Sequence, residues 1–297
     1  MKKLGGIYPA LVTPYTPDGS INHEALREIV EWNIEKGVNG FYVNGSTGEC
    51  HLLTLEERKA ALETVVDQVH GRAHVIAHIG CVSTDQTIEL GLHAKETGAD
   101  AISAIPPFYY KFSADEIVAH YHAIVDAVKM PMIVYNMPAM SGVELTPELL
   151  KRLVSNPWIA GVKHTSMNLF QLERMRKVNE DLVLFNGHDE VCLAGLAMGA
   201  DGAIGSTYNF MAEKFLKIAH YVRENQLDLA LQEQTSANTV IEALVHTGVF
   251  AGTKYLLKKL KGLKGIDCGG CRKPFSDLSE ENMRLLDQVA EQEGLTK

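Results

Sequence analysis

Cysteine and tryptophan are scarce in this chain, and no segment is rich in lysine and arginine. Its 297 residues include five cysteines and two tryptophans. An odd, scattered set of cysteines indicates reduced thiols in the cytoplasm rather than a disulfide framework. The 28 Lys and Arg against 37 Asp and Glu give a formal net charge of −9, which argues against nucleic acid as a partner.

Long apolar runs are also missing. No stretch approaches the roughly 20 apolar residues that span a membrane. The start, Met1-Lys2-Lys3, resembles the basic end of a signal peptide, but Pro9, Pro14, Pro17 and Asp18 interrupt the segment that would have to be apolar. We therefore expect a cytoplasmic protein that is neither secreted nor inserted in a membrane.

Only Cys268-Gly269-Gly270-Cys271 pairs cysteines at a short spacing. A zinc site would need two more ligands, and the sequence has no second CxxC. A thioredoxin-like site would open a helix after an early strand, whereas this segment lies late in the chain. We interpret it as a glycine-rich loop with incidental cysteines.

Three segments share one pattern: 36–43, 97–104 and 198–205. Each has a glycine where a helix would end, then one small or apolar residue, then Asp or Asn. A short apolar run follows, as is typical of a buried strand. This recurrence indicates a repeated unit of one strand and one helix.

The repeated unit extends along most of the chain. Thr54-Leu55-Glu56-Glu57 and Ser113-Ala114-Asp115-Glu116 are capping boxes that predict helix starts. Eight strand–helix units within about 225 residues fit an α/β fold of the (β/α)8 TIM-barrel type. A doubly wound open sheet is the alternative, but no GxGxxG pattern follows its first strand. The predicted strands lie near 6–12, 39–43, 73–78, 101–105, 131–135, 158–163, 182–186 and 201–205.

Residues after about 225 show helical patterns and no strand candidates. The predicted helices are 227–244, 249–260 and 279–293. We therefore predict a barrel of residues 1–225 and a C-terminal helical extension of residues 226–297. The extension is expected to pack on the barrel in a single structural unit.

Two chemically useful side chains end neighbouring predicted strands. Lys163 follows the apolar run 158–162, and Tyr135 follows the apolar run 132–134. Burial lowers the pKa of a lysine, and a neutral amine forms a Schiff base with a ketone. A phenol beside such a lysine could shuttle the protons of carbon–carbon cleavage. Taken singly, a lysine that extends to solvent or a tyrosine with a buried ring is the simpler account; together they predict a Schiff-base site.

Other polar residues follow predicted strands at the same end, where barrel enzymes carry their chemistry. The loop 45–48 offers N–H groups and the hydroxyls of Ser46 and Thr47 to a carboxylate, although an ordinary turn explains it equally well. Asp189 and Glu190 offer acceptors to a polyol, or else stabilise the N-terminus of a helix at 191–198.

Two other kinds of site remain open at these strand ends. The segment 202–207 lies where TIM barrels often bind phosphate, which makes a phosphosugar enzyme the natural rival. His164, His188 and Asp189 could be assembled into a metal site, but they lack any recognised ligand spacing. We expect no metal.

Three motifs resemble those of a known family. Gly45-Ser46-Thr47-Gly48-Glu49, Tyr135-Asn136-Met137-Pro138 and Gly161-Val162-Lys163 are similar to signatures of the pyruvate-dependent, Schiff-base class I lyases. That superfamily includes N-acetylneuraminate lyase and dihydrodipicolinate synthase. The similarity continues through Cys271-Arg272-Lys273-Pro274-Phe275 and so covers most of the chain. It implies a homotetramer that needs no metal or organic cofactor.

The resemblance also implies a role for each matching residue. Lys163 would form the imine, Tyr135 would shuttle protons, and Tyr109 would support that relay. The remaining matches divide between the two ends of the substrate. Ser46, Thr47 and Thr165 would hold the pyruvyl carboxylate, and Gly187, Asp189, Glu190 and Ser206 would bind a sugar-derived polyol.

One position separates branches of the superfamily. The synthase branch carries an arginine two residues after the proline of the Tyr-Asn-x-Pro motif, where this chain has Met140. The segments 186–190 and 205–209 resemble the branch that acts on sialic acid. The resemblance therefore implies reversible cleavage of N-acetylneuraminate to pyruvate and N-acetylmannosamine. The alternatives are another pyruvate aldolase, such as one for a 2-keto-3-deoxy sugar acid, or a non-catalytic sugar-acid sensor.

Overall fold

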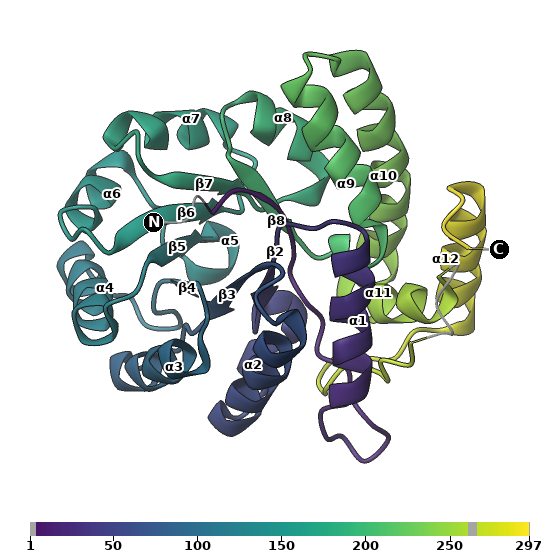
Figure 1. Ribbon diagram of the computed structural model, residues 1–297, viewed down its shortest axis with the longest axis horizontal. Helices are drawn as coiled ribbons and strands as arrows, with labels where there is room; N and C mark the ends of the chain where they lie inside the picture. Colours follow the sequence, from purple (N-terminus) through teal and green to yellow (C-terminus); the bar gives the residue numbers. More distant parts are fainter. Residues whose placement is uncertain (1–3, 261–265, 297) are drawn as a thin grey trace.

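Eight short parallel strands form the centre of the molecule (Figure 1). The structure is a computed structural model that describes residues 4–260 and 266–296. The run Met1-Lys2-Lys3, residues 261–265 and residue 297 lie outside the described residues. The strands are β1 (Gly6–Pro9), β2 (Gly40–Val43), β3 (His74–His78), β4 (Ala101–Ala104), β5 (Met132–Asn136), β6 (Ile159–His164), β7 (Val183–Asn186) and β8 (Gly202–Gly205).

The strands close on themselves, as a barrel requires. β1 pairs with β8, and the remaining strands follow in sequence order round to β2. A bridge between Ala10 and Tyr42 spans the last seam, where the N–H of Leu11 donates to the carbonyl of Tyr42 at 3.0 Å. The (β/α)8 prediction is therefore confirmed, and the doubly wound open sheet is wrong.

A helix follows each strand on the outside of the ring (Figure 1). Both predicted capping boxes are present, at Thr54 with Glu57 and at Ser113 with Glu116. The helices up to β8 are α1 (His23–Glu35), α2 (Leu55–Val69), α3 (Thr84–Thr97), α4 (Ala114–Val128), α5 (Pro138–Ser141), α6 (Pro147–Leu153), α7 (Leu169–Val178) and α8 (Cys192–Ala197). Short 3-10 turns lie at η1 (Ser46–Gly48), η2 (Cys50–Leu52) and η3 (Asp189–Val191).

The helix predicted at 191–198 differs in its start. It is divided into η3 and the shorter α8, because residues 189–191 form a tight 3-10 turn first. Asp189 and Glu190 consequently lie in that turn. They are not ahead of a regular α-helix.

Helices α9 (Tyr208–Arg223), α10 (Leu227–Thr247), α11 (Val249–Lys259) and α12 (Glu280–Gln292) complete the described chain. Figure 1 shows them in green to yellow on one side of the barrel, and α10 packs along α9 and against α12. The three predicted C-terminal helices are present. The unit boundary at residue 225 stays a prediction. None of the helices in the described ranges has the length and apolarity needed to cross a membrane.

Two apolar clusters hold these layers together. The larger lies between the strands and the surrounding helices. The smaller fills the barrel interior, where Tyr8 packs so close to β2 that a Cβ on Gly40 would lie 2.1 Å from its ring. Because strand side chains alternate, the residues two positions beyond this interior layer also point inward. Tyr135, two residues after the interior Ile133, is one of them.

Candidate active site

Lys163 lies near the end of β6 and is 4% exposed. Its Nζ is 4.3 Å from the centre of the Tyr42 ring and 4.0 Å from the centre of the Tyr135 ring. Within residues 4–260 and 266–296, Lys254 is the other buried lysine, and it forms an ion pair with Glu49 at 2.6 Å. Lys163 has aromatic neighbours in place of such a partner, so its amine is not committed to a structural ion pair.

Tyr135 is brought to Lys163 by strand register. The two residues are direct partners in the ladder between β5 and β6. The Tyr135 side chain is 3% exposed, and its hydroxyl donates to Sδ of Met137 at 3.0 Å. The structure therefore brings the two predicted residues together.

Tyr42 was not predicted from the sequence. Its ring forms the second wall around the Lys163 amine, and its hydroxyl shares a 3.0 Å hydrogen bond with Ser103. Burial raises its pKa well above the usual 10. The phenol thus stays protonated and holds the ring in place. The sequence did not show which way the Tyr42 side chain points, because it lies in a run of apolar residues. Only the register of the barrel decides which strand residues point inward.

The predicted carboxylate-binding loop forms η1 after β2. Thr47 is buried, Ser46 is half-buried, and the hydroxyls of Thr47 and Ser206 are 2.6 Å apart. The loop after β2 is therefore joined to the loop after β8. Thr13 adds support from the segment after β1, since its hydroxyl donates to the carbonyl of Gly48 at 2.8 Å.

Thr165 and Gly187 meet between β6 and β7. A Cβ on Gly187 would lie 1.9 Å from Oγ1 of Thr165. The segments after β6 and β7 can therefore approach this closely only because residue 187 is glycine. Oγ1 of Thr165 is buried and has no hydrogen-bond partner among the described residues. Buried polar atoms are usually paired, so this hydroxyl is a candidate substrate contact.

Asp189 is buried and reaches across to the loop after β8. Its Oδ2 accepts from the N–H of Thr207 at 2.9 Å and from the Thr207 hydroxyl at 2.7 Å. Its Oδ1 is buried without a hydrogen-bond partner in the described ranges. The carboxylate thus bonds to the loop after β8 instead of capping its own helix. It also occupies the Thr207 N–H that a phosphate cradle at 202–207 would need.

The burial of Asp189 predicts a pH effect on stability. Burial raises its pKa from the usual 3.8 to about 6, while the Thr207 hydrogen bonds and, more weakly, Lys163 act in the opposite direction. The folded protein therefore binds this proton more tightly than the unfolded chain. The resulting stability is full below pH 4 and is lost as pH rises through 6. At 1.36 kcal/mol per unit the loss is about 3 kcal/mol.

Urea denaturation of the wild type and of Asp189→Asn at several pH values checks this expectation. Because asparagine does not titrate, the difference in unfolding free energy between the two proteins should change by about 3 kcal/mol between pH 4 and pH 7. A difference that stays constant over that range would contradict it.

Glu190 lies beside Asp189 and is more open, with a third of its side chain exposed. Its Oε1 is 3.2 Å from Nδ1 of His188. That hydrogen bond holds the pKa of Glu190 below its usual value. Glu190 is therefore ionised at neutral pH and can accept hydrogen bonds.

The possible metal ligands are engaged elsewhere. The amide of Asn136 lies 2.9 Å from Nδ1 of His164, and Nε2 of His164 lies 3.0 Å from the carbonyl of Asn168. No group of three or more His, Cys, Asp or Glu side chains suited to a metal occurs in the described part of the chain. Cys268 and Cys271 are free thiols in a loop.

Tyr109 is not brought to the site within this chain. It is 85% exposed, has a φ of 75°, and its ring stacks edge-on against Tyr110 at 5.0 Å. Its predicted support of the Tyr135 relay stays a prediction.

A cavity of about 400 Å³ opens beside Ser46. Met137 lines it from the start of α5, Met140 from within α5, and Phe250 from α11. Among the described residues, no arginine lines it. Met140, at the position where the synthase branch carries an arginine, therefore gives this cavity an apolar side.

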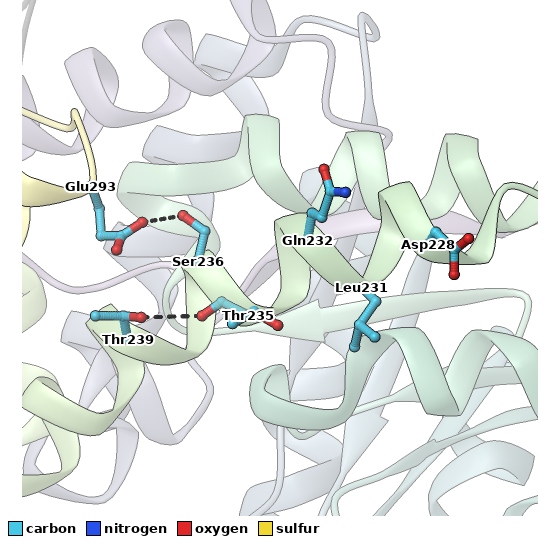
Figure 2. A pocket seen from close by; sticks show the side chains of 7 residues that line it. All are labelled: Asp228, Leu231, Gln232, Thr235, Ser236, Thr239 and Glu293. Carbon is cyan, nitrogen blue, oxygen red and sulfur yellow. Dashed lines mark hydrogen bonds between the residues drawn. The ribbon is translucent and has the colours of Figure 1, made fainter.

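A larger depression than this cavity lies away from these residues. It is an open groove along α10 with a volume of about 750 Å³. Figure 2 shows the side chains that line it, where the Ser236 hydroxyl donates to the Glu293 carboxylate. Asp228, Leu231 and Thr239 line it as well. None of the predicted site residues lies in it, so size alone does not identify the active site.

A TIM barrel with a buried, unpaired lysine amine against a tyrosine at adjacent strand ends has the arrangement of a class I aldolase. Comparison with known proteins agrees with this class. The profile of the dihydrodipicolinate synthetase family matches residues 3–293, and the chain belongs to that family.

Three relatives are informative. The N-acetylneuraminate lyase of Rhizobium meliloti is 44% identical over 284 residues, which cover 96% of this chain and 93% of that protein. CdNal from Clostridium difficile, solved in complex with mannosamine, is 34% identical with a TM-score of 0.94 over 98% of this chain and 99% of that one. A catalytic lysine mutant of Ruminococcus gnavus sialic acid aldolase is 33% identical with a TM-score of 0.94, over 99% and 98% of the respective chains.

Proposed function

We propose that this chain cleaves N-acetylneuraminate reversibly to pyruvate and N-acetylmannosamine through a Schiff base on Lys163. The observation that carries the proposal is the buried Lys163 amine, held between two tyrosine rings and free of an ion pair among the described residues. The sialic acid lyases among its relatives support the choice of substrate.

The reaction begins when the unprotonated Lys163 amine attacks the keto carbon of the open-chain sugar acid. The carbinolamine hydroxyl takes the phenolic proton of Tyr135 and leaves as water, which gives an iminium and leaves Tyr135 as a phenolate. Tyr135 takes the proton of the C4 hydroxyl, the C3–C4 bond breaks, and its electron pair moves into the iminium to give an enamine. N-Acetylmannosamine leaves, the enamine is protonated, and hydrolysis releases pyruvate and regenerates the amine.

The two ends of the substrate would be held by different loops. Ser46, Thr47 and Thr165 would donate hydrogen bonds to the carboxylate beside the keto carbon. The sugar-derived polyol would lie toward the loops after β7 and β8, where Gly187 leaves backbone exposed and Asp189, Glu190 and Ser206 supply acceptors and a hydroxyl. These seven roles are proposals that rest on the positions described above.

Release of pyruvate from N-acetylneuraminate tests the proposal, with lactate dehydrogenase and NADH as the detector. We expect cleavage of N-acetylneuraminate to exceed cleavage of a 2-keto-3-deoxy sugar acid. A faster reaction with the deoxy acid would favour the aldolase alternative. Absence of turnover with both, alongside tight binding, would favour a sugar-acid sensor.

The covalent mechanism predicts independence from metal ions. Exhaustive chelation should leave the rate of pyruvate release unchanged, because the iminium serves as the electron sink. The rate should be measured before and after chelation, with excess chelator kept in the assay. Activity that is lost and then restored by a divalent cation would favour a metal-dependent aldolase.

We further propose a homotetramer in the cytoplasm. Exposed apolar side chains support an assembly: Tyr109 and Tyr110 after β4, Phe170 on α7, and Leu227 and Leu231 on α10 are all largely accessible in the single chain. The free thiols support a reducing compartment. Light scattering would measure the mass of the assembly directly.

A further inference from the structure

The loop that carries Ser46 and Thr47 is tied to the C-terminal part of the chain by a buried ion pair. Nζ of Lys254, on α11, lies 2.6 Å from Oε1 of Glu49, and the two side chains are 1% and 0% exposed. Glu49 directly follows η1. The pair thus connects residues 205 positions apart, immediately behind the candidate carboxylate-binding hydroxyls.

A second set of contacts from residues 270–272, here called the strap, completes the attachment. The N–H of Arg272 donates to Oε2 of Glu49 at 2.7 Å, and Lys254 also donates to the carbonyl of Gly270 at 2.9 Å. The Arg272 guanidinium donates to the carbonyl of Leu52 at 2.9 Å and pairs with Glu57. Both oxygens of Glu49 are therefore engaged, one by α11 and one by the strap.

The backbone of Glu49 makes the loop dependent on that attachment. Its φ of 58° lies in the left-handed region, which is unfavourable for a residue with a side chain. In this conformation its N–H donates to the carbonyl of Ser46 at 3.0 Å and closes η1. Such a conformation persists when surrounding contacts hold it. The buried carboxylate of Glu49 provides those contacts.

We propose that Glu49 and Lys254 are positioning residues that set the hydroxyls of Ser46 and Thr47 for the keto-acid carboxylate, an inference that rests on the proposed function. Removal of Lys254 leaves the Glu49 carboxylate buried without its counter-ion, which is strongly unfavourable. The carboxylate then has to take up a proton or turn toward water. Either change loosens the turn that η1 closes. We therefore expect weaker binding of the keto-acid carboxylate, with the amine chemistry of Lys163 unchanged.

Trapping the pyruvate imine with borohydride tests this positioning role without involving the sugar-binding residues. The full-length protein is titrated with pyruvate, the imine is reduced, and the labelled fraction is read by mass spectrometry. For Lys254→Met we expect the pyruvate concentration at half-maximal labelling to rise about tenfold or more, with the labelled fraction at saturation unchanged. The double variant Glu49→Gln with Lys254→Met removes both charges and should show a smaller rise.

Lys258→Met is the matched control. Lys258 lies one turn further along α11 and pairs with Asp267 at 2.9 Å, but both side chains of this pair are more than half exposed. This control should label like the wild type. Wild-type half-saturation in Lys254→Met, or an equal rise in Lys258→Met, would overturn the proposal. If Lys254→Met does not fold, the double variant decides: half-saturation equal to wild type would also overturn it.

Failure of the proposed function is distinguishable from these outcomes. A wild-type protein that forms no pyruvate imine would contradict the function itself. A wild-type protein that forms the imine but does not cleave N-acetylneuraminate would change the sugar assignment and leave the trapping test intact. A normal imine in every variant, with the same pyruvate dependence, would contradict only the positioning role.

Discussion

Replacement of Lys163 with arginine is expected to abolish pyruvate release while leaving the fold nearly intact. The guanidinium stays protonated and cannot attack a carbonyl as a neutral amine does. We expect the loss to be about 10³-fold or more, because the covalent route is removed altogether. The side chain remains long and cationic, so the aromatic contacts of Tyr42 and Tyr135 retain a partner.

Borohydride trapping with pyruvate measures the same step directly. The wild type should lose activity and gain one reduced pyruvyl group per chain, mapped by peptide sequencing to Lys163. Lys254→Met serves as the comparison, because its removal should weaken trapping without moving the label. A label on any other lysine, or full activity in Lys163→Arg, would exclude the mechanism.

Glu190→Ala is expected to separate cleavage of the sugar acid from formation of the pyruvate imine. The Glu190 carboxylate is ionised and a third exposed, with His188 on one side. Loss of an acceptor from a site that binds sugar hydroxyls costs about 1–3 kcal/mol. That corresponds to about a five- to 150-fold lower kcat/KM for N-acetylneuraminate. Pyruvate trapping on Lys163 should be unchanged.

Glu180→Ala, at an exposed position before β7, is the control for loss of one surface carboxylate. The reverse reaction adds a second readout: condensation of pyruvate with N-acetylmannosamine should greatly exceed condensation with aspartate semialdehyde, since Met140 offers no charge to a second carboxylate. Equal damage to trapping and cleavage in Glu190→Ala would contradict its place at the sugar end. A preference for the semialdehyde would contradict the sugar assignment.

The strands were predictable because each unit repeats a strong local signal. In three units a glycine ends the preceding helix, and a short apolar run marks each strand, so the described strands fall within a few residues of the predicted ones. The first strand is the least accurate. It was predicted to reach residue 12 but ends at Pro9, because the ladder with β8 stops there while the chain continues buried.

The meeting of Lys163 and Tyr135 was also accessible from the sequence. Both residues end apolar runs that belong to consecutive units, and consecutive strands of a TIM barrel are neighbours. The register then places them side by side without further information. Tyr42 was missed because its contact depends on which face of β2 points inward.

Long-range polar contacts could not be predicted in the same way. Glu49 and Lys254 are buried only because α11 and the strap return to the loop after β2. In the sequence, each reads as an ordinary charged residue that would lie in solvent. The approach of Gly187 to Thr165 is similarly a property of two strand ends and not of either segment.

The short contact between Thr47 and Ser206 has a consequence for attempts to redesign substrate range. Thr47 belongs to the loop proposed to bind pyruvate, and Ser206 belongs to the loop proposed to bind the sugar. A change at either residue therefore affects both binding sites. Libraries that vary Ser206 to admit new aldehydes will select at the same time for altered pyruvate use. Substitutions in the loop after β7 avoid this coupling, because no residue of that loop forms a hydrogen bond with Thr47 in the described structure.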